Sequence, residues 1–203
     1  MLQLTIAFWS SVCREAKSIL RKAEGSAILE FAIALPLLVV FVVGIYDFSG
    51  ALNEKQKIEQ SAQEGAIVAA AQPTSDLSTG NPDSLQAVVA AVLNSLTGSG
   101  VLAPGNQCKL QGSPQQTALT WTYTFSGCSS DPNDFLTIII NRGWLSGPST
   151  GLPQQTSAVG TMVTVSYPYH WRFNSVIQLL FPGPSSYASF LTLTESAIVH
   201  NQM

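Results

Sequence analysis

The stretch "AEGSAILEFAIALPLLVVFVVGIYDF", residues 23–48, decides how the rest of the chain is read. It is almost entirely apolar, and between Ser26 and Tyr46 its only charged residue is Glu30. At about 1.5 Å per residue, a helix over these positions covers roughly 30 Å, the thickness of a bilayer core. The stretch therefore predicts a transmembrane helix over residues 26–46.

The balance of insertion energies favours this interpretation. Eleven of the sixteen residues from Phe31 to Tyr46 are Leu, Ile, Val or Phe. At about −0.3 to −0.6 kcal/mol each they contribute roughly −3 to −7 kcal/mol, while an acidic residue costs about +2.5 to +3.5 kcal/mol at a helix centre and less near an end. Two alternatives are the core helix of a soluble protein and a cleavable secretory signal. The apolar core of such a signal is shorter, about 7 to 15 residues.

Charge sets the orientation of the segment. Four of the nine Lys and Arg residues precede the apolar run and two follow it closely. By the preference of basic residues for the cytoplasmic side, the N-terminus lies in the cytoplasm and residues 47–203 lie outside. The net charge of −3, with only 10% charged residues, excludes the basic surface of a nucleic-acid-binding protein.

The helix is expected to continue beyond the membrane. Residues 47–72 contain no Pro and are rich in Ala, Gln, Glu and Lys, which favour helices. A weakly apolar face recurs at helical spacing, formed by Leu52, Ile58, Ala62, Ala66 and Ala69. We therefore expect one helix from about residue 26 to 72, with Pro36 as the place for a kink.

Residues 73–203 predict an extracytoplasmic α+β domain with one core. A turn-rich break precedes a second helix over residues 85–96, capped by Asp83 or Ser84. Residues 174–182 are expected to form a short helix or turn. Alternating or continuous apolar runs then predict an antiparallel sheet. Its expected strands are residues 118–125, 135–140, 158–169 and 189–199.

One predicted strand alternates Leu119 and a row of aromatic residues, Trp121, Tyr123 and Phe125, with threonines. A row with this spacing lies on one face of a strand. It favours a place in the core of the sheet over an exposed face that binds sugars or a partner.

The positions of the three cysteines agree with the predicted membrane topology. Cys13 precedes the apolar run and would be cytoplasmic and reduced, whereas Cys108 and Cys128 lie outside, where disulfides form. We expect these two to pair. The alternative is two unrelated buried thiols.

The sequence carries no catalytic signature. It lacks Gly-x-Ser-x-Gly, His-Glu-x-x-His and phosphate-binding loops, and its two histidines are His170 and His200. The cysteines lack the Cys-x-x-Cys spacing of a zinc site. We expect no enzyme, metal or cofactor, with a membrane-tethered enzyme as the remote alternative.

Gly25, followed by Glu30 and Phe31 ahead of the apolar run, resembles the pseudopilins of type IV filament systems. The resemblance is to the TadE-like family of the Tad (Flp) pilus machinery. "LPLLVVFVVGIYDF" and "SAQEGAIVAA" are similar to the family's apolar stretch and Ala-rich helix. Near the end of the chain, "VTVSYPYHW" and "LTLTESAIV" are similar to its late β segments.

This resemblance implies that a prepilin peptidase cuts between Gly25 and Ser26 and removes the basic leader, residues 1–25. The new amine at Ser26 would lie roughly 6 Å along the helix from Glu30, whose carboxylate offsets it in a medium of low dielectric constant. Phe31 belongs to the same processing and assembly motif. The alternative is that Glu30 merely lies among the lipid headgroups.

The expected function is that of a minor pseudopilin or assembly component of a Tad pilus, in the inner (cytoplasmic) membrane with a periplasmic or extracellular domain. Its implied partners are the prepilin peptidase, other Tad pilins and pseudopilins, inner-membrane platform proteins and membrane lipid. The alternative function is an unprocessed bitopic anchor that carries an extracytoplasmic binding domain.

Overall fold

The computed structural model describes residues 23–78, 80–102, 108–128, 134–145, 159–173 and 190–201. The chain divides into two compact units, Met1–Phe48 and Ser49–Met203, and the second unit is called the head below. Helix α2, Ala23–Ala71, contributes to both units. All other described elements belong to the head.

The long helix predicted from the sequence is confirmed. It begins at Ala23 rather than near residue 26, and it ends at Ala71. Pro36 lies inside it, where the missing N–H removes one backbone hydrogen bond. The apolar run and its Ala-rich continuation therefore form one element.

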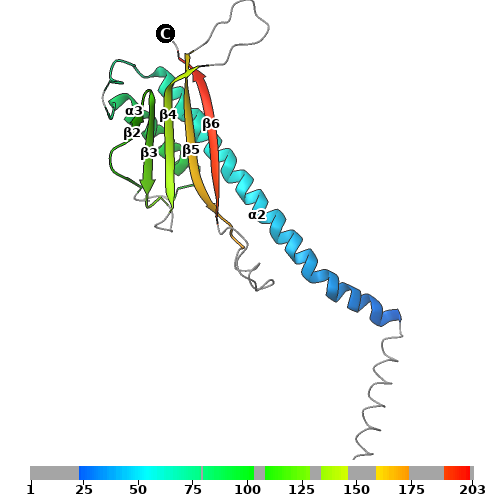
Figure 1. The fold of residues 1–203 in the computed structure, drawn as a ribbon. Coiled ribbons are helices and arrows are strands. Elements are labelled where there is room, and N and C mark those ends of the chain that lie inside the picture. Colours follow the sequence, from blue (N-terminus) through cyan, green and yellow to red (C-terminus); the bar gives the residue numbers. More distant parts are fainter. Residues whose placement is uncertain are drawn as a thin grey trace, which may run out of the picture. The chain divides into compact units, whose positions relative to one another are not determined.

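The head contains a second helix and an antiparallel sheet, as predicted (Figure 1). Helix α3 covers Asp83–Gly98. The sheet has the order β1-β3-β4-β5-β6, and β2 pairs with β3 off this path. The strands are β1 Lys109–Leu110, β2 Gln115–Thr117, β3 Thr120–Ser126, β4 Phe135–Leu145, β5 Val159–His170 and β6 Phe190–His200.

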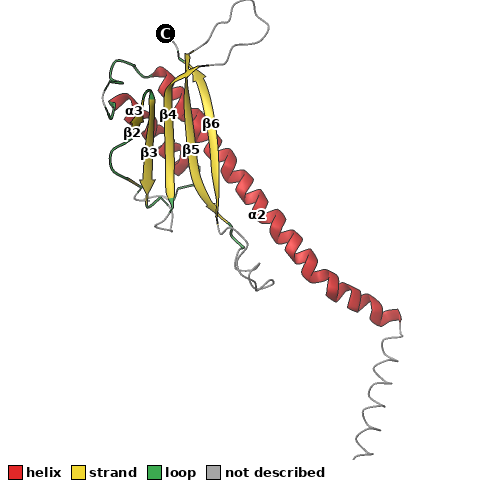
Figure 2. Cartoon of the chain, in the orientation of Figure 1, coloured by secondary structure: helices red, strands yellow, loops and turns green. Residues whose placement is uncertain are grey.

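Within the head, the helices cover one face of the sheet (Figure 2). The core lies between these layers, and Trp121, Tyr123 and Phe125 of β3 are buried in it. The aromatic row is thus a core row. Helix α2 contributes small side chains to this core, and its Ala62 and Ala66 are fully buried.

Two side chains lie differently from the prediction. Leu52 is 45% exposed, and Ala51 beside it is buried instead. Leu119 belongs to the turn before β3 and is 47% exposed. At Leu52 the local apolar pattern pointed one residue away from the buried face, whereas Leu119 is exposed because β3 begins only after it.

The predicted cap of α3 is wrong. The N-cap residue is Pro82, and neither Asp83 nor Ser84 caps the helix with its side chain. Instead the Ser84 backbone N–H donates to Asp76 Oδ2 and its hydroxyl donates to Asp76 Oδ1, both at 2.9 Å. The N–H bond holds the pKa of the Asp76 carboxyl below its ordinary value.

The strand boundaries otherwise agree with the sequence, with one extension. Strand β4 runs on to Leu145, past an irregularity in its pairing with β5 between Asn141 and Trp144. β5 and β6 match their predicted segments to within a residue at each end. The predicted short helix or turn at 174–182 and most of the leader lie outside the described residues.

Candidate functional site

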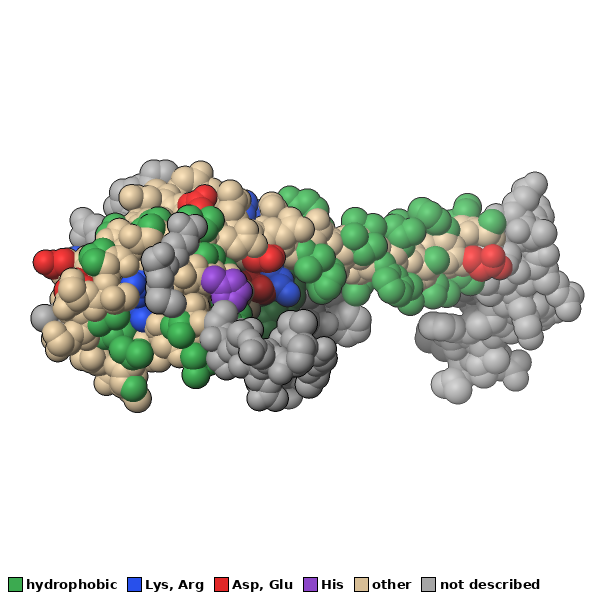
Figure 3. All heavy atoms as spheres, turned by 90° about the horizontal axis from the view of Figure 1, so that it is seen from above, with side chains coloured by type: hydrophobic (Ala, Val, Ile, Leu, Met, Phe, Trp, Pro, Cys, Tyr) green, Lys and Arg blue, Asp and Glu red, His purple; other side chains and the backbone are tan. Residues whose placement is uncertain are grey.

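Residues 27–46 of α2, the apolar segment, present large apolar side chains, most of which the rest of the described structure leaves exposed. Ile28 is 72% exposed and Ile33 is 70% exposed. Figure 3 shows hydrophobic side chains gathered along this helix. Its most apolar window has a mean hydropathy of 2.7 and is not buried by protein. This helix is a candidate single-pass membrane anchor, because lipid removes such side chains from water.

The predicted cleavage site lies within the first turn of the described helix. Gly25 and Ser26 are the third and fourth residues of α2. Position 30 follows Ser26 by four residues, so the two positions lie on the same helix face, one turn apart. Glu30 and Phe31 are both exposed. The structure therefore presents the carboxylate near the end at which processing would create an amine.

Two ion pairs tie the head part of α2 to neighbouring strands. Lys55 Nζ lies 3.2 Å from Glu195 Oε1 of β6. Arg172 Nη2, just after β5, lies 4.0 Å from Glu54 Oε1. Burial raises the pKa of the Glu54 carboxyl, against the opposing effects of Arg172 and Lys57. Glu195 thus has a structural role that the sequence did not predict.

The C-terminal end of α2 is held by a buried cation. Arg142 of β4 is only 4% exposed, and its Nη2 donates to Gln72 O at 2.8 Å and to Pro73 O at 3.4 Å. Its Nη1 donates to Thr161 Oγ1 at 3.5 Å. Both carbonyl groups belong to the two residues that directly follow α2, so the guanidinium fixes the chain where it leaves the helix. Burial lowers the pKa of Arg142, but the group keeps its charge.

The contact between α2 and α3 depends on Gly65. A Cβ at this position would lie 2.5 Å from Val92 Cγ2 and 3.3 Å from Val163 Cγ1. Because real Cβ atoms do not approach other atoms so closely, only glycine permits this spacing of helix, helix and sheet. The close approach explains why the Ala-rich motif contains glycine.

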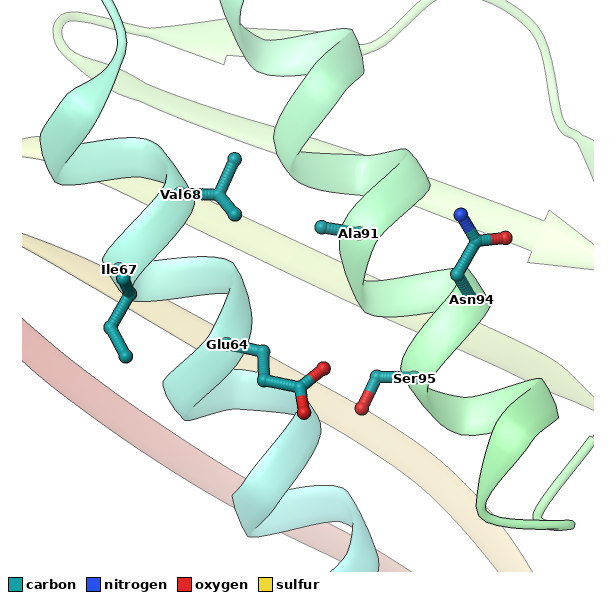
Figure 4. A pocket seen from close by; sticks show the side chains of 6 residues that line it. All are labelled: Glu64, Ile67, Val68, Ala91, Asn94 and Ser95. Atoms are coloured by element: carbon teal, nitrogen blue, oxygen red, sulfur yellow. The ribbon is translucent and has the colours of Figure 1, made fainter.

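A shallow groove of about 500 Å³ lies between the same two helices. Figure 4 shows Glu64 of α2 extending towards Ser95 of α3, with Val68 and Ala91 between the helices. Ile67 lines the groove and is 61% exposed. The groove combines the apolar side chains of Ile67, Val68 and Ala91 with the carboxylate of Glu64.

The histidine and the two cysteines that the sequence singled out within the head each contact a specific partner. His170, at the end of β5, lies 2.6 Å from Asp134 Oδ2 through its Nε2. Cys108 and Cys128 are joined by a disulfide, with their Cα atoms 4.5 Å apart. Among the described residues, no group of three or more His, Cys, Asp or Glu is placed to hold a metal ion.

Sequence reasoning missed Arg142 and Asp76, which organise the helix ends. A signal for Arg142 existed, because only three basic residues follow position 57. In so weakly charged a domain, each cation is a candidate for a specific structural contact.

Comparison with known proteins gives a family match over part of the chain. Residues 25–66 match the family model described as TadE-like protein, which confirms the resemblance seen in the sequence. None of the curated proteins and none of the solved structures matches the chain. The family match covers the apolar segment with Glu30 and ends at Ala66, in the part of α2 that packs in the head. It associates the chain with Tad pilus systems.

Proposed function

We propose that this TadE-like protein is a minor pseudopilin or assembly component of a Tad (Flp) type IV pilus, matured by a prepilin peptidase that cuts between Gly25 and Ser26. One observation carries the proposal. Glu30 is exposed at the start of an uncovered apolar helix, one turn from Ser26 and inside the TadE-like segment.

Local unwinding of α2 would make the proposed cleavage site accessible. Proteases bind an extended backbone, whereas the bond between Gly25 and Ser26 is helical in the intact chain. Glycine in a helix is less favourable than alanine by about 1 kcal/mol, and this one lies only two residues after Ala23. Local unwinding at the membrane face is therefore inexpensive, and it would free the leader for removal.

Cleavage would then change the electrostatics of the helix end. The new ammonium at Ser26 lies roughly 6 Å along the helix from Glu30. In a medium of low dielectric constant the two charges attract strongly, either within one chain or between staggered neighbouring subunits. A carboxylate near a helix N-terminus also interacts favourably with the helix dipole. Glu30 would thus favour a specific packing of helices in the membrane.

The head would act outside the membrane, with the N-terminus in the cytoplasm. We propose other Tad pilins or pseudopilins and the inner-membrane platform as its partners. The support is the family match together with the positive charge on the leader side of the apolar segment.

The proposal is tested by the N-terminus of the protein extracted from membranes of its native host. We expect the mature chain to begin at Ser26. Gly25→Leu should leave the longer precursor, because a bulky side chain hinders entry of the backbone into the peptidase. The control is Gly44→Leu, at a position where a Cβ meets nothing within 4 Å. A wild-type chain that retains Met1 beside an active prepilin peptidase would contradict the proposal.

The second candidate is an unprocessed bitopic anchor that carries an extracytoplasmic binding domain. It is favoured by the continuity of α2 through Gly25 and Ser26, since no break in the helix marks the site. The same experiment separates the candidates, because the plain anchor keeps its first 25 residues.

A further inference from the structure

We propose that the outer edge of β6 accepts an extended strand from a different polypeptide chain, which joins the sheet of the head by backbone hydrogen bonds. β6 is the last strand in the sheet order, and no described strand pairs with its other side. The inference concerns the head alone. It does not depend on whether the leader is removed.

The register shows which backbone groups face outward. Asn201 N–H donates to Val159 O at 3.2 Å, so the pair 201 and 159 is a hydrogen-bonded one. Hydrogen-bonded and non-bonded pairs alternate in an antiparallel ladder. The odd-numbered residues of β6 therefore bond to β5, and the even-numbered ones direct their N–H and C=O groups away from it. The even-numbered residues are Phe190, Thr192, Thr194, Ser196, Ile198 and His200.

This row of outward groups is long, and none of the described strands pairs with it. The pairing of β5 with β6 runs from Phe190 to His200 without a register shift. β6 contains no Pro, Lys or Arg, which are residues that commonly block an edge strand. Its single acidic residue, Glu195, is already paired with Lys55. Thr194 and Ser196 are exposed.

The opposite edge of the sheet differs in each respect. It consists of the short strands β1 and β2, with 2 and 3 residues. Between them Gly112 has a positive φ of 69°, which interrupts the extended backbone. The disulfide at Cys108 directly precedes β1. Only the β6 edge can add a strand of more than a few residues.

The composition of β6 argues against a second copy as the occupant. If two β6 strands paired over their full length, antiparallel or parallel, Glu195 would lie opposite the Glu195 of the other copy. Like charges directly opposite each other destabilise a sheet. A strand of another chain, without an acidic residue at that place, avoids this repulsion.

The sheet also specifies the side chains that fit. On the face away from the helices, Thr164 Oγ1 and Ser196 Oγ lie 2.7 Å apart, and Ser166 Oγ and Thr194 Oγ1 lie 2.9 Å apart. These two rows of hydroxyl groups reach the edge of the sheet. A partner strand with Thr, Ser or Val on this face continues the rows without burying a charge.

The test uses the purified full-length chain in detergent and a fluorescent peptide, Lys-Thr-Val-Thr-Val-Thr-Val-Thr-Lys, as the probe. We expect Thr194→Pro to weaken binding about tenfold or more, because it removes one outward N–H and places a ring against the incoming strand. Thr194→Ala is the matched control, since both variants lose the Ser166 hydroxyl bond but alanine keeps the N–H. It should bind within about twofold of the wild type.

A second measurement needs no change in the protein. The same peptide, N-methylated at alternate residues, keeps its side chains but loses the donors along one edge, and it should bind about tenfold or more weakly. Three results would overturn the proposal: no binding of the unmodified peptide to the wild type, equal binding by Thr194→Pro and Thr194→Ala, or equal binding of both peptides. A β6-mediated dimer that the peptide dissociates would overturn the choice of a different chain as partner.

Discussion

The two parts of helix α2 differ sharply in what surrounds them. In the apolar segment, residues 27–46, the side chains are large and exposed, and Ile45 is 70% exposed. In the part within the head, one face carries small residues, and Ala62, Ala66 and Ala69 are fully buried. Size explains the difference. Small side chains let the helix approach the sheet closely, whereas large ones around the whole helix circumference require a surrounding apolar medium.

The largest effect is expected when the same substitution, glycine to valine, is made in each of the two parts of α2. Gly65→Val should destabilise the head by about 3 kcal/mol, because the added atoms overlap Val92 and Val163. Gly44→Val should leave the unfolding of the head unchanged, since a Cβ there meets nothing within 4 Å. Urea unfolding of the two variants measures both effects. Equal stabilities would show that the close packing at Gly65 is not essential.

The next largest effect concerns the end of α2 in the head. Arg142→Met should cost about 2 kcal/mol, because the carbonyl groups of Gln72 and Pro73 lose their buried donor. Arg172→Met is the control, since that side chain is 57% exposed and its pair with Glu54 is long. It should cost less than about 1 kcal/mol. Thermal unfolding separates them, and a harmless Arg142→Met would refute this role of Arg142.

A third test removes the only charged side chain of the apolar segment, that of Glu30. Glu30→Ala should leave membrane insertion intact or improve it by about 1 kcal/mol, since a charge near a helix end costs less than at the centre. If the proposed cleavage creates an amine at Ser26, pilus assembly should nevertheless be impaired, because this amine would lose its partner. Membrane fractionation and filament yield measure the two effects. Glu59→Ala, an exposed site in the head part of α2, is the control. Normal assembly of Glu30→Ala would remove the support for amine pairing.

The smallest effect is a dependence of head stability on acid. The pKa of Asp76 is lowered from 3.8 in the folded state, chiefly by the Ser84 N–H. Its stabilisation is therefore fully present above pH 3.8 and is lost as the pH falls through the lower folded value. Asp76→Asn should flatten the pH profile of unfolding in this range, whereas Asp83→Asn should not. An unchanged profile in Asp76→Asn would contradict the assignment.

Much of the fold was predictable because its signals are local. The apolar run, the Ala-rich continuation and the alternation in β3 each follow from neighbouring residues, and the structure confirms the elements they predict. The errors at Leu52 and at the cap of α3 share a cause. Each depended on which distant element covers the residue. Asp76, for example, reaches Ser84 from outside the helix.

The sequence by itself determined the membrane-length helix, the position of Glu30 after Gly25 and the similarity to TadE-like proteins. Length, hydropathy and spacing are sums over adjacent residues, so no knowledge of the fold is needed. Only the tertiary structure decided that Arg142 holds the end of α2, 70 residues away in the chain, and that Gly65 sets the helix spacing. It also left the outer edge of β6 without a paired strand among the described residues. These features depend on contacts between distant segments, and such contacts exist only once the sheet and helices have packed together.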